Sequence, residues 1–196
     1  KGCVQTTGYR NKLEFTFSNK QYLSSTDLNA GLSFVKNVLG FHAPRLFDKV
    51  IDIETCHLQP APSNEIKNFV RELSAMHNLT FYDIRQHTGL LRNLMIRVSS
   101  TGEVLVNVVF GEEDGEAVQF VMNSIHAAFP QITSLNYTIN LKMNDTVYDL
   151  DIHLFAGKPF VVEKLRDFKF RISPKSFFQT NPSQAVNLYD IAREFA

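Results

Sequence analysis

Residues 90–110 read LLRNLMIRVSSTGEVLVNVVF, and this stretch decides the fold class. Two runs rich in aliphatic side chains, residues 90–98 and 103–110, flank the short polar sequence Ser-Ser-Thr-Gly. Strand-like runs joined by a short loop that contains glycine are typical of a β-hairpin. The stretch therefore predicts two antiparallel neighbours in a sheet.

The segments around this hairpin predict further strands. Residues 9–17 alternate apolar and polar side chains, which is the period of a strand with one buried face. Two more pairs of strand-like runs follow, at residues 132–141 with 147–155 and at 160–165 with 168–172. Consecutive pairs joined by short loops favour an antiparallel arrangement.

Three helices are predicted from apolar side chains at helical spacing. The first begins near Ser63, and the second covers about residues 114–129 and ends before Pro130. The third begins at Asn181-Pro182, an N-cap residue followed by proline at the first helical position. Strand pairs with helices between them predict an α+β fold, with a mostly antiparallel sheet, two inserted helices, and a linker and further helix after it.

The composition limits the classes of function. The chain has 196 residues and 44% hydrophobic content, which is enough for one core of ordinary size. Twenty basic residues balance twenty acidic ones, so contact with nucleic acid must come from local groups of basic side chains rather than from net charge. Two cysteines predict a reducing compartment, and no apolar run reaches the roughly 20 residues that span a bilayer. We expect a cytoplasmic protein that binds neither membrane nor DNA.

Residues 168–182, FKFRISPKSFFQTNP, carry the most chemical information. An aromatic ring can stack on an unstacked base, an amide can hydrogen-bond a base edge or a cofactor, and a helix N-terminus attracts anionic groups. The plain structural interpretation is a strand, a turn and a capped helix, with Phe177 and Phe178 in the core. Taken alone, the residues favour this structural interpretation, because most phenylalanines are buried.

Residues 170–189, FRISPKSFFQTNPSQAVNLY, closely resemble the stretch that leads into the catalytic domain of bacterial RNA (uracil-5-)-methyltransferases. Three further motifs resemble that family in the same order: YRNKLEF at 9–15, GFHAPRLFDKVIDIETCHLQ at 40–59 and HTGLLRNLMIR at 87–97. The resemblance covers nearly the whole chain. It implies an S-adenosylmethionine-dependent enzyme that forms 5-methyluridine in 23S ribosomal RNA or in the T-loop of tRNA.

The resemblance also implies a division of the chain and roles for two residues. Residues 1–165 would form a central α+β domain, and residues 166–196 the linker and the start of a catalytic domain that continues outside this chain. Gln179 is similar to the family glutamine at the place where S-adenosylmethionine meets the target uracil, and Phe177 to the aromatic residue beside the flipped base. The attacking cysteine and the carboxylate base of the family lie in the later domain. We therefore expect no catalytic residue here, no cofactor bound to this chain alone, and no activity from it.

Cys56 lies in the segment IDIETCHLQ, residues 51–59. A lone cysteine is usually a small, partly buried hydrophobic residue. In the cluster-bearing branch of the family, the cysteine at this place is the last of four thiolate ligands of a [4Fe-4S] cluster, and the other three lie upstream. Cys3 does not reproduce that upstream run, so we expect a cluster in the full-length protein only. This likeness favours ribosomal RNA as the substrate over tRNA.

Several basic side chains are candidates for RNA contact, because guanidinium and ammonium groups bind phosphates. They are Arg10, Lys12, Arg92, Lys169 and Arg171. Arg92 and Arg97 are an odd number of positions apart, so a regular strand places them on opposite faces and at most one can contact a ligand. The alternative for Arg10 and Lys12 is a solvated strand edge that discourages sheet extension.

Two further alternatives concern a metal and the function as a whole. Asp149, Asp151 and His153 share one face of an expected strand, which suggests a metal site, but an exposed polar face explains them better. The rival function is a non-catalytic RNA-binding or scaffold domain of the same ancestry.

Overall fold

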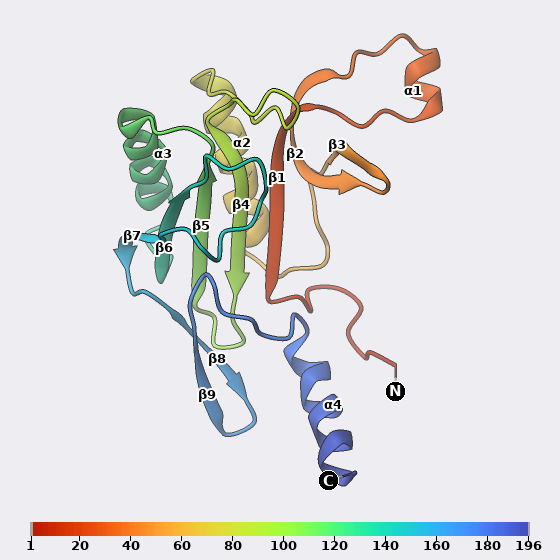
Figure 1. Ribbon diagram of the computed structural model, residues 1–196. Helices are drawn as coiled ribbons and strands as arrows, with labels where there is room; N and C mark the ends of the chain where they lie inside the picture. Colours follow the sequence, from red (N-terminus) through yellow and green to blue (C-terminus); the bar gives the residue numbers. More distant parts are fainter. Residues whose placement is uncertain (1, 196) are drawn as a thin grey trace.

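The computed structural model describes residues 2–195. A seven-stranded sheet with the order β3-β2-β1-β4-β5-β6-β7 forms the centre, and a separate ribbon, β8-β9, extends from one end of it (Figure 1). The strands are β1 (Lys12–Lys20), β2 (Val35–Ala43), β3 (Leu46–Asp52), β4 (Leu91–Val98), β5 (Val104–Phe110), β6 (Ser134–Ile139), β7 (His153–Gly157), β8 (Val161–Leu165) and β9 (Phe168–Ile172).

The sheet is antiparallel except at one pair of strands. β4 and β5 form the predicted hairpin, with Leu94 opposite Val108. β5 and β6 run parallel, with Val106 opposite Leu135, because a helix carries the chain from one strand to the next. The predicted pairs β6–β7 and β8–β9 are also antiparallel. The predicted α+β class with a mostly antiparallel sheet is confirmed.

Four helices occur within the described residues. They are α1 (Ser25–Asn29), α2 (Ser63–Met76), α3 (Gly115–Ala128) and α4 (Pro182–Glu194). The last three match the predicted helices, and the Asp114 side chain caps α3 by accepting a hydrogen bond from the Ala117 N–H at 3.0 Å. α1 was not predicted, because its five residues are too few to show a helical period. No helix in residues 2–195 is long and apolar enough to cross a membrane.

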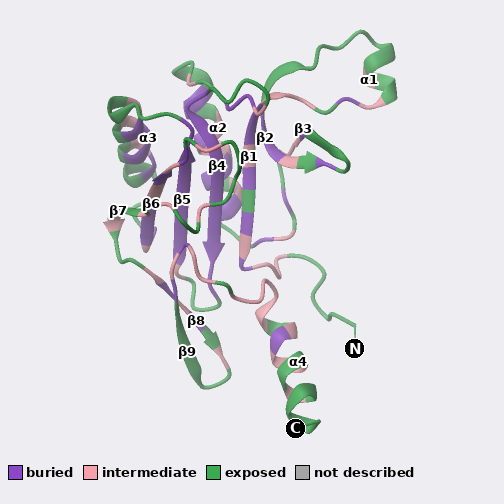
Figure 2. Cartoon of the chain, viewed as in Figure 1, coloured by how far each residue is buried: buried purple, intermediate pink, exposed green. Residues whose placement is uncertain are grey.

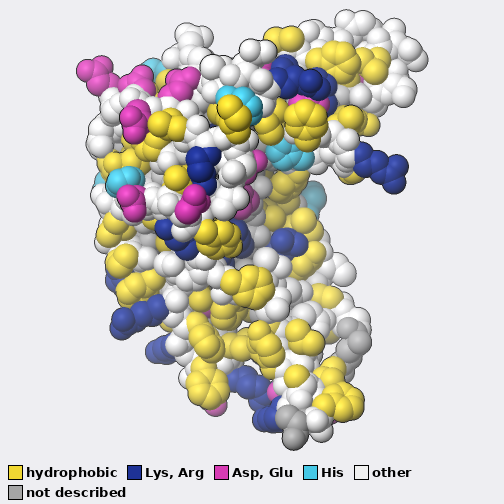
Figure 3. All heavy atoms as spheres, in the orientation of Figure 1, with side chains coloured by type: hydrophobic (Ala, Val, Ile, Leu, Met, Phe, Trp, Pro, Cys, Tyr) yellow, Lys and Arg dark blue, Asp and Glu magenta, His cyan; other side chains and the backbone are white. Residues whose placement is uncertain are grey.

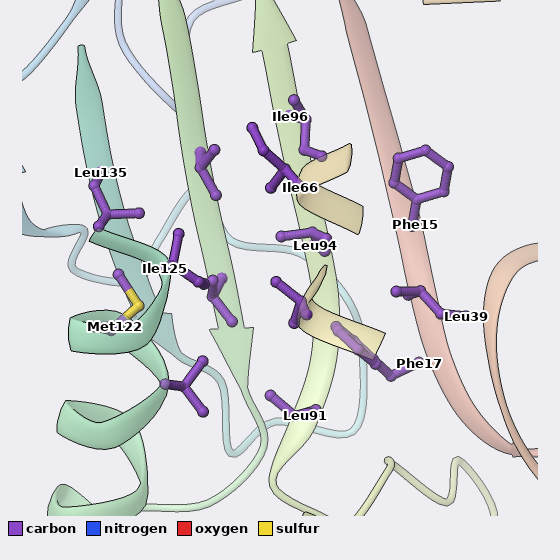
Figure 4. Close-up of a cluster of buried hydrophobic side chains, with 14 of the residues drawn as sticks. Phe15, Phe17, Leu39, Ile66, Leu91, Leu94, Ile96, Met122, Ile125 and Leu135 are labelled. Carbon is purple, nitrogen blue, oxygen red and sulfur yellow. The ribbon is translucent and has the colours of Figure 1, made fainter. Parts of the chain in front are cut away.

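The main core lies between the sheet and the helices α2 and α3. Inward side chains of β1 and β4, such as Phe15, Phe17 and Leu94, meet Ile66 of α2, while Met122 of α3 packs over the β5–β6 side (Figure 4). All five are at most 1% exposed. The buried surface is concentrated in the central strands, whereas α1 and the ribbon are largely exposed (Figure 2). The alternating pattern of residues 9–17 therefore predicted the correct buried face.

The opposite face of the sheet carries a smaller apolar cluster. Met95 of β4 and Leu105 of β5 pack there against Val161 and Ile172 of the ribbon, and Phe178 packs against this group. The ribbon is thus attached to the sheet through apolar side chains. This contact places the segment after β9 close to β4.

One sequence expectation differs from the structure in detail. β7 begins at His153, so Asp149 and Asp151 lie in the loop before it rather than on a strand with His153. The division between residues 165 and 166 remains a proposal, and it falls in the turn between β8 and β9, which pair along their whole length. The strands β2 and β3 were not predicted from the sequence.

Candidate functional site

The linker that joins β9 to α4, residues 173–181, contains an ordered, hydrogen-bonded turn. The Ser176 N–H donates to the Ser173 carbonyl at 3.0 Å, and the Ser173 N–H donates to the Ser176 Oγ at 2.9 Å. Pro174 between them is buried. The Ser-Pro turn predicted from the sequence therefore exists, and it fixes the direction in which the next residues leave it.

The two adjacent phenylalanines after this turn have opposite environments. Phe177 is 79% exposed, although the structural interpretation of the sequence placed it in the core. Phe178 packs against the Met95–Ile172 cluster, and its ring centroid lies 5.7 Å from that of Phe170. Burial of Phe178 explains the fold of the linker, and it leaves Phe177 available to a ligand.

Gln179 lines a pocket of about 350 Å³ between the linker and α4. The first turn of α4 is capped by Asn181, whose Oδ1 accepts a hydrogen bond from the Gln184 N–H at 3.1 Å. The pocket is lined by side chains that carry amide groups together with apolar ones: Gln179, Thr180, Asn181, Gln184, Ala185, Asn187, Leu188 and Ile191. Amides can donate to and accept from a base or a cofactor, so this lining is chemically suited to either.

Two of the predicted RNA-binding residues come together near the linker. Arg10 and Lys12 line one pocket with Thr180, and the Lys12 ammonium is also 3.5 Å from the Glu14 carboxylate. Lys12 and Lys175 line a second cavity of about 100 Å³, over the face of the sheet opposite the helices. Basic and acidic side chains are intermixed on the face shown in Figure 3, which has no continuous basic surface. Any RNA contact here is therefore local.

The other predicted basic residues do not join this group. Lys169 and Arg171 are exposed on β9, and the Arg171 guanidinium lies over the Phe160 ring at 4.9 Å. Their strand belongs to the ribbon, which projects beyond the large sheet (Figure 1). The structure therefore separates them from the pocket beside Thr180.

Arg92 requires a correction, because its guanidinium is enclosed. The residue is 1% exposed, and it donates to the carbonyls of Asn140, Lys142 and Asn144 and to the Asp145 carboxylate at 2.6–3.0 Å. These bonds hold the loop before β7 against the sheet. A side chain occupied in this way has no donor free for a phosphate, so the predicted RNA contact of Arg92 is wrong for this conformation.

The expectation that Arg92 and Arg97 lie on opposite faces is also wrong. The pairing of β4 with β5 shifts register between Leu91 and Asn93, which leaves Arg92 as an extra residue and resets the alternation. Arg97 consequently reaches the same side as Arg92, where its Nη2 donates to the Ser176 carbonyl at 2.5 Å. A bulge of one residue cannot be read from the apolar pattern alone.

A [4Fe-4S] cluster does not fit the described residues by themselves. Cys56 is 8% exposed and its backbone N–H donates to the Asn64 Oδ1 at 2.8 Å, whereas Cys3 is exposed near the start of α4. No group of three or more metal-ligating side chains exists in residues 2–195. A cluster at Cys56 would need thiolates from outside this part of the chain.

The acidic residues before β7 have ordinary structural contacts. The Asp149 carboxylate pairs with the Lys142 ammonium at 2.5 Å, and the His153 ring stacks on the Tyr137 ring with centroids 4.8 Å apart. The hydrogen bond from Lys142 holds the pKa of Asp149 below its usual value. The preference for a polar surface over a metal site agrees with this geometry.

Two residues at this site were missed in the sequence. Asn11, between Arg10 and Lys12, and Glu163, within the apolar run of β8, are buried and contact each other through a hydrogen bond of 3.0 Å. A signal for Glu163 was present, because it shares the inward face of an alternating strand with Val161. An acid at such a position predicts a buried polar network.

Comparison with known proteins now adds to this geometry. No family model matches the chain. A Bacteroides thetaiotaomicron protein named an uncharacterized RNA methyltransferase is 49% identical over 199 residues, which cover 100% of this chain and 44% of that relative. A Porphyromonas gingivalis protein with the same name is 47% identical, over 100% of this chain and 43% of the relative.

A solved structure agrees with these relatives. The fold matches the crystal structure of Pyrococcus abyssi tRNA (uracil-54, C5)-methyltransferase in complex with S-adenosyl-L-homocysteine, with a TM-score of 0.70 and 25% sequence identity. The match covers 97% of this chain and 42% of that protein. The chain thus spans less than half the length of the proteins it matches.

The sequence relatives and the protein of similar fold point to one class, the RNA methyltransferases. Over nearly its whole length, the chain is similar to these RNA methyltransferases and to a tRNA (uracil-54, C5)-methyltransferase, which agrees with the RNA (uracil-5-)-methyltransferase family. The resemblance read from the four sequence motifs is confirmed.

Proposed function

We propose that this chain is part of an S-adenosylmethionine-dependent enzyme that forms 5-methyluridine in RNA. In this proposal the chain positions the RNA and contributes Phe177 and Gln179 to the site where cofactor and uracil meet. The observation that carries it is the 79% exposure of Phe177 on a linker whose neighbouring Phe178 is packed into the protein. An exposed ring on an ordered backbone is available to a partner outside the chain.

The two side chains suit different parts of the task. A uracil must leave its stack before its C5 and C6 atoms can be reached, and flipping costs a few kcal/mol that an aromatic platform can offset. The Gln179 amide can donate to a uracil carbonyl or accept from its N3–H. The cofactor, when bound, supplies the methyl group. Neither Phe177 nor Gln179 forms a covalent bond in the proposed reaction.

The rest of the chain would guide RNA to the linker. Arg10 and Lys12 beside Thr180, together with Lys175 and the 66% exposed ring of Tyr148 at the smaller cavity, offer cations and an aromatic surface within one region. Phosphate contacts position the strand, while aromatic rings stack on single-stranded bases. Residues 166–196 would enter the catalytic domain, and the exposed apolar side chains Leu188 and Ile191 of α4 fit that assignment.

We propose ribosomal RNA as the substrate, because the Cys56 segment resembles the cluster-bearing branch of the family. A tRNA is the second candidate, since the Pyrococcus abyssi protein of similar fold is a tRNA (uracil-54, C5)-methyltransferase. Transfer of labelled methyl groups by the full-length protein to unmodified 23S ribosomal RNA and to unmodified tRNA, in separate reactions, distinguishes them.

The role of Gln179 is tested by Gln179→Ala in the full-length protein. We expect methyl transfer to fall by about one to three orders of magnitude, equal to roughly 1.4–4 kcal/mol of transition-state stabilisation. The matched control is Gln131→Ala, which removes an exposed glutamine from the loop after α3. Turnover of Gln179→Ala at the level of this control would refute the proposed role.

The competing interpretation is a non-catalytic RNA-binding domain. It predicts that the full-length protein binds RNA but incorporates no methyl group into either substrate. It also predicts that Phe177→Ala weakens RNA binding, and that Gln179→Ala affects RNA binding but no methyl transfer. Methyl incorporation above background at uracil C5 would exclude the non-catalytic interpretation.

A further inference from the structure

Three buried polar side chains from separate parts of the chain form a network that contacts the backbone of the linker. Asn11 precedes β1, Arg97 lies in β4 and Glu163 lies in β8, and they are 6%, 3% and 2% exposed. The Asn11 Nδ2 donates to the Glu163 carboxylate at 3.0 Å and to the Gln179 carbonyl at 3.2 Å. Long-range contacts of this kind connect both sheets to one short segment.

The hydrogen bonds from Arg97 and Asn11 hold the linker backbone before and after the two phenylalanines. Arg97 binds the Ser176 carbonyl, one residue before Phe177. The Asn11 backbone N–H donates to the Thr180 carbonyl at 2.9 Å, and its side chain holds the Gln179 carbonyl. With both ends fixed and Phe178 packed inward, the backbone has little freedom to turn Phe177 in another direction.

We propose that Asn11, Arg97 and Glu163 are positioning residues that fix the linker so that Phe177 and Gln179 are presented to the target base. This inference rests on the proposed function. None of the three touches the base or the cofactor in this scheme, because Asn11 and Arg97 act through the linker backbone and Glu163 acts through Asn11. Misplacement of a reactive group by about 1 Å can cost on the order of 100-fold in rate, so residues that fix the linker should directly affect turnover.

The charges of the network support this assignment. A buried carboxylate is costly unless it is hydrogen-bonded, and Glu163 accepts from Asn11 and from the backbone N–H of Ser100 at 2.9 Å and of Lys164 at 3.2 Å. Burial lowers the pKa of Arg97, and the nearby charge of Glu163 opposes that change.

The first test measures order in the linker of this chain. Backbone ¹⁵N relaxation should give order parameters of about 0.85 for residues 176–180, and Asn11→Ala should lower them below about 0.6. The matched control is Asn136→Ala in β6, which removes an equally buried amide that donates to the Val106 carbonyl and the Ser134 hydroxyl. Unchanged order in Asn11→Ala, or equal loosening in Asn136→Ala, overturns the proposal.

A second pair of variants covers the case in which Asn11→Ala fails to fold. Arg97→Lys retains a charged donor toward the Ser176 carbonyl, whereas Arg97→Met removes it at similar volume. We expect Arg97→Lys to keep the linker more ordered than Arg97→Met does. Equal order in these two variants contradicts the role of Arg97.

The decisive test is a double-mutant cycle for methyl transfer by the full-length protein. Asn11→Ala should lower kcat by about 10- to 100-fold with little change in KM, because it displaces groups that act in the transition state. In a Gln179→Ala background the same substitution should cost much less, since the group that it positions is already gone. A full, additive loss would mean that Asn11 acts only through general stability.

The positioning role and the proposed function can be refuted separately. If the unsubstituted full-length protein methylates neither RNA, the proposed function is wrong, and the relaxation experiment still decides whether these three residues hold the linker. If it methylates RNA while Asn11→Ala retains wild-type kcat, the positioning role is wrong and the proposed function stands.

Discussion

Adjacent residues of the same type can have different tasks, and Phe177 and Phe178 illustrate this. Both are apolar rings, yet the turn at residues 173–176 and the inward packing of Phe178 direct Phe177 toward solvent. Arg92 and Arg97 form a comparable pair, since both are buried and both bind backbone carbonyls. Arg92 holds the loop before β7, whereas Arg97 holds the linker. Side-chain chemistry alone distinguishes neither pair.

The two phenylalanines should differ in their contribution to stability. Phe178→Ala should lower the free energy of unfolding by about 2 kcal/mol, somewhat less than the roughly 3–5 kcal/mol of a fully buried ring. Phe177→Ala should change it by no more than about 0.5 kcal/mol, because the ring is 79% exposed. Urea unfolding followed by circular dichroism measures both. A similar loss for the two variants would place Phe177 in the core after all.

Arg92→Ala should be strongly destabilising. The substitution removes a buried guanidinium and leaves three carbonyls without their donor, one of them in a buried hydrogen bond, which costs about 3 kcal/mol in the free energy of unfolding. Its partner Asp145 has a side chain that is 44% exposed, so Asp145→Asn should cost less than about 1 kcal/mol. If Arg92→Ala instead weakens RNA binding at unchanged stability, the structural role given to Arg92 is incorrect.

At the scale of elements, polar side chains connect strands to the turns beside them. The Asp83 carboxylate accepts from the Asn19 amide at 2.9 Å and from the Lys20 ammonium at 3.1 Å, which ties the end of β1 to the turn before β4. It also accepts from the backbone N–H of Arg85 at 2.8 Å. Burial of Asp83 raises its pKa, but hydrogen bonds from Asn19 and Lys20 outweigh this and hold the pKa well below its usual range.

This junction should be sensitive to acid. The pKa of Asp83 is lower in the folded than in the unfolded protein, so its stabilisation is complete above the ordinary aspartate pKa of about 4 and is lost as the pH falls below that value. Asp83→Asn should therefore have a lower free energy of unfolding than the wild type at pH 7. This difference in the free energy of unfolding should be smaller at pH 3. Urea unfolding at both pH values tests this, with Asp151→Asn in an exposed loop as the control. An equal difference in the free energy of unfolding at both pH values would contradict this role of Asp83.

The whole molecule consists of a sheet with helices on one face and the linker on the other. The helix side supplies most of the apolar core, and the linker side carries the smaller cluster, the pockets and the candidate site. α4 leaves the sheet and contacts it little, and its side chains Leu188, Tyr189 and Ile191 are 43–53% exposed. This separation of a stable layer from a functional layer suits a domain that presents groups to a second domain.

The chain of residues 1–196 alone should transfer no methyl group. In the proposed scheme the attacking thiolate and the base belong to the catalytic domain, so labelled-methyl incorporation into unmodified ribosomal RNA should stay at background. The full-length protein, assayed in parallel, is the positive control. Robust incorporation by the shorter chain would contradict the division of labour proposed between the two domains.

The sequence by itself determined the class of the fold and the family. Hairpins and helices were readable because alternation and helical spacing are local properties of the chain, and β4–β5, α2, α3 and α4 follow them. The linker and its Asn181 cap were readable for the same reason. Gln179 and Phe177 were named from resemblance, and their roles stay proposals.

Only the tertiary structure decided which buried polar groups meet. One extra residue in β4 moved Arg92 and Arg97 to the same face, and no local pattern reports such a shift. Asn11 and Glu163 lie 152 positions apart, and they come together because the start of the ribbon packs against the end of the sheet. The exposure of Phe177 likewise depends on the burial of Phe178 against side chains from four strands. Contacts between distant parts of the chain depend on packing, which local sequence patterns do not encode.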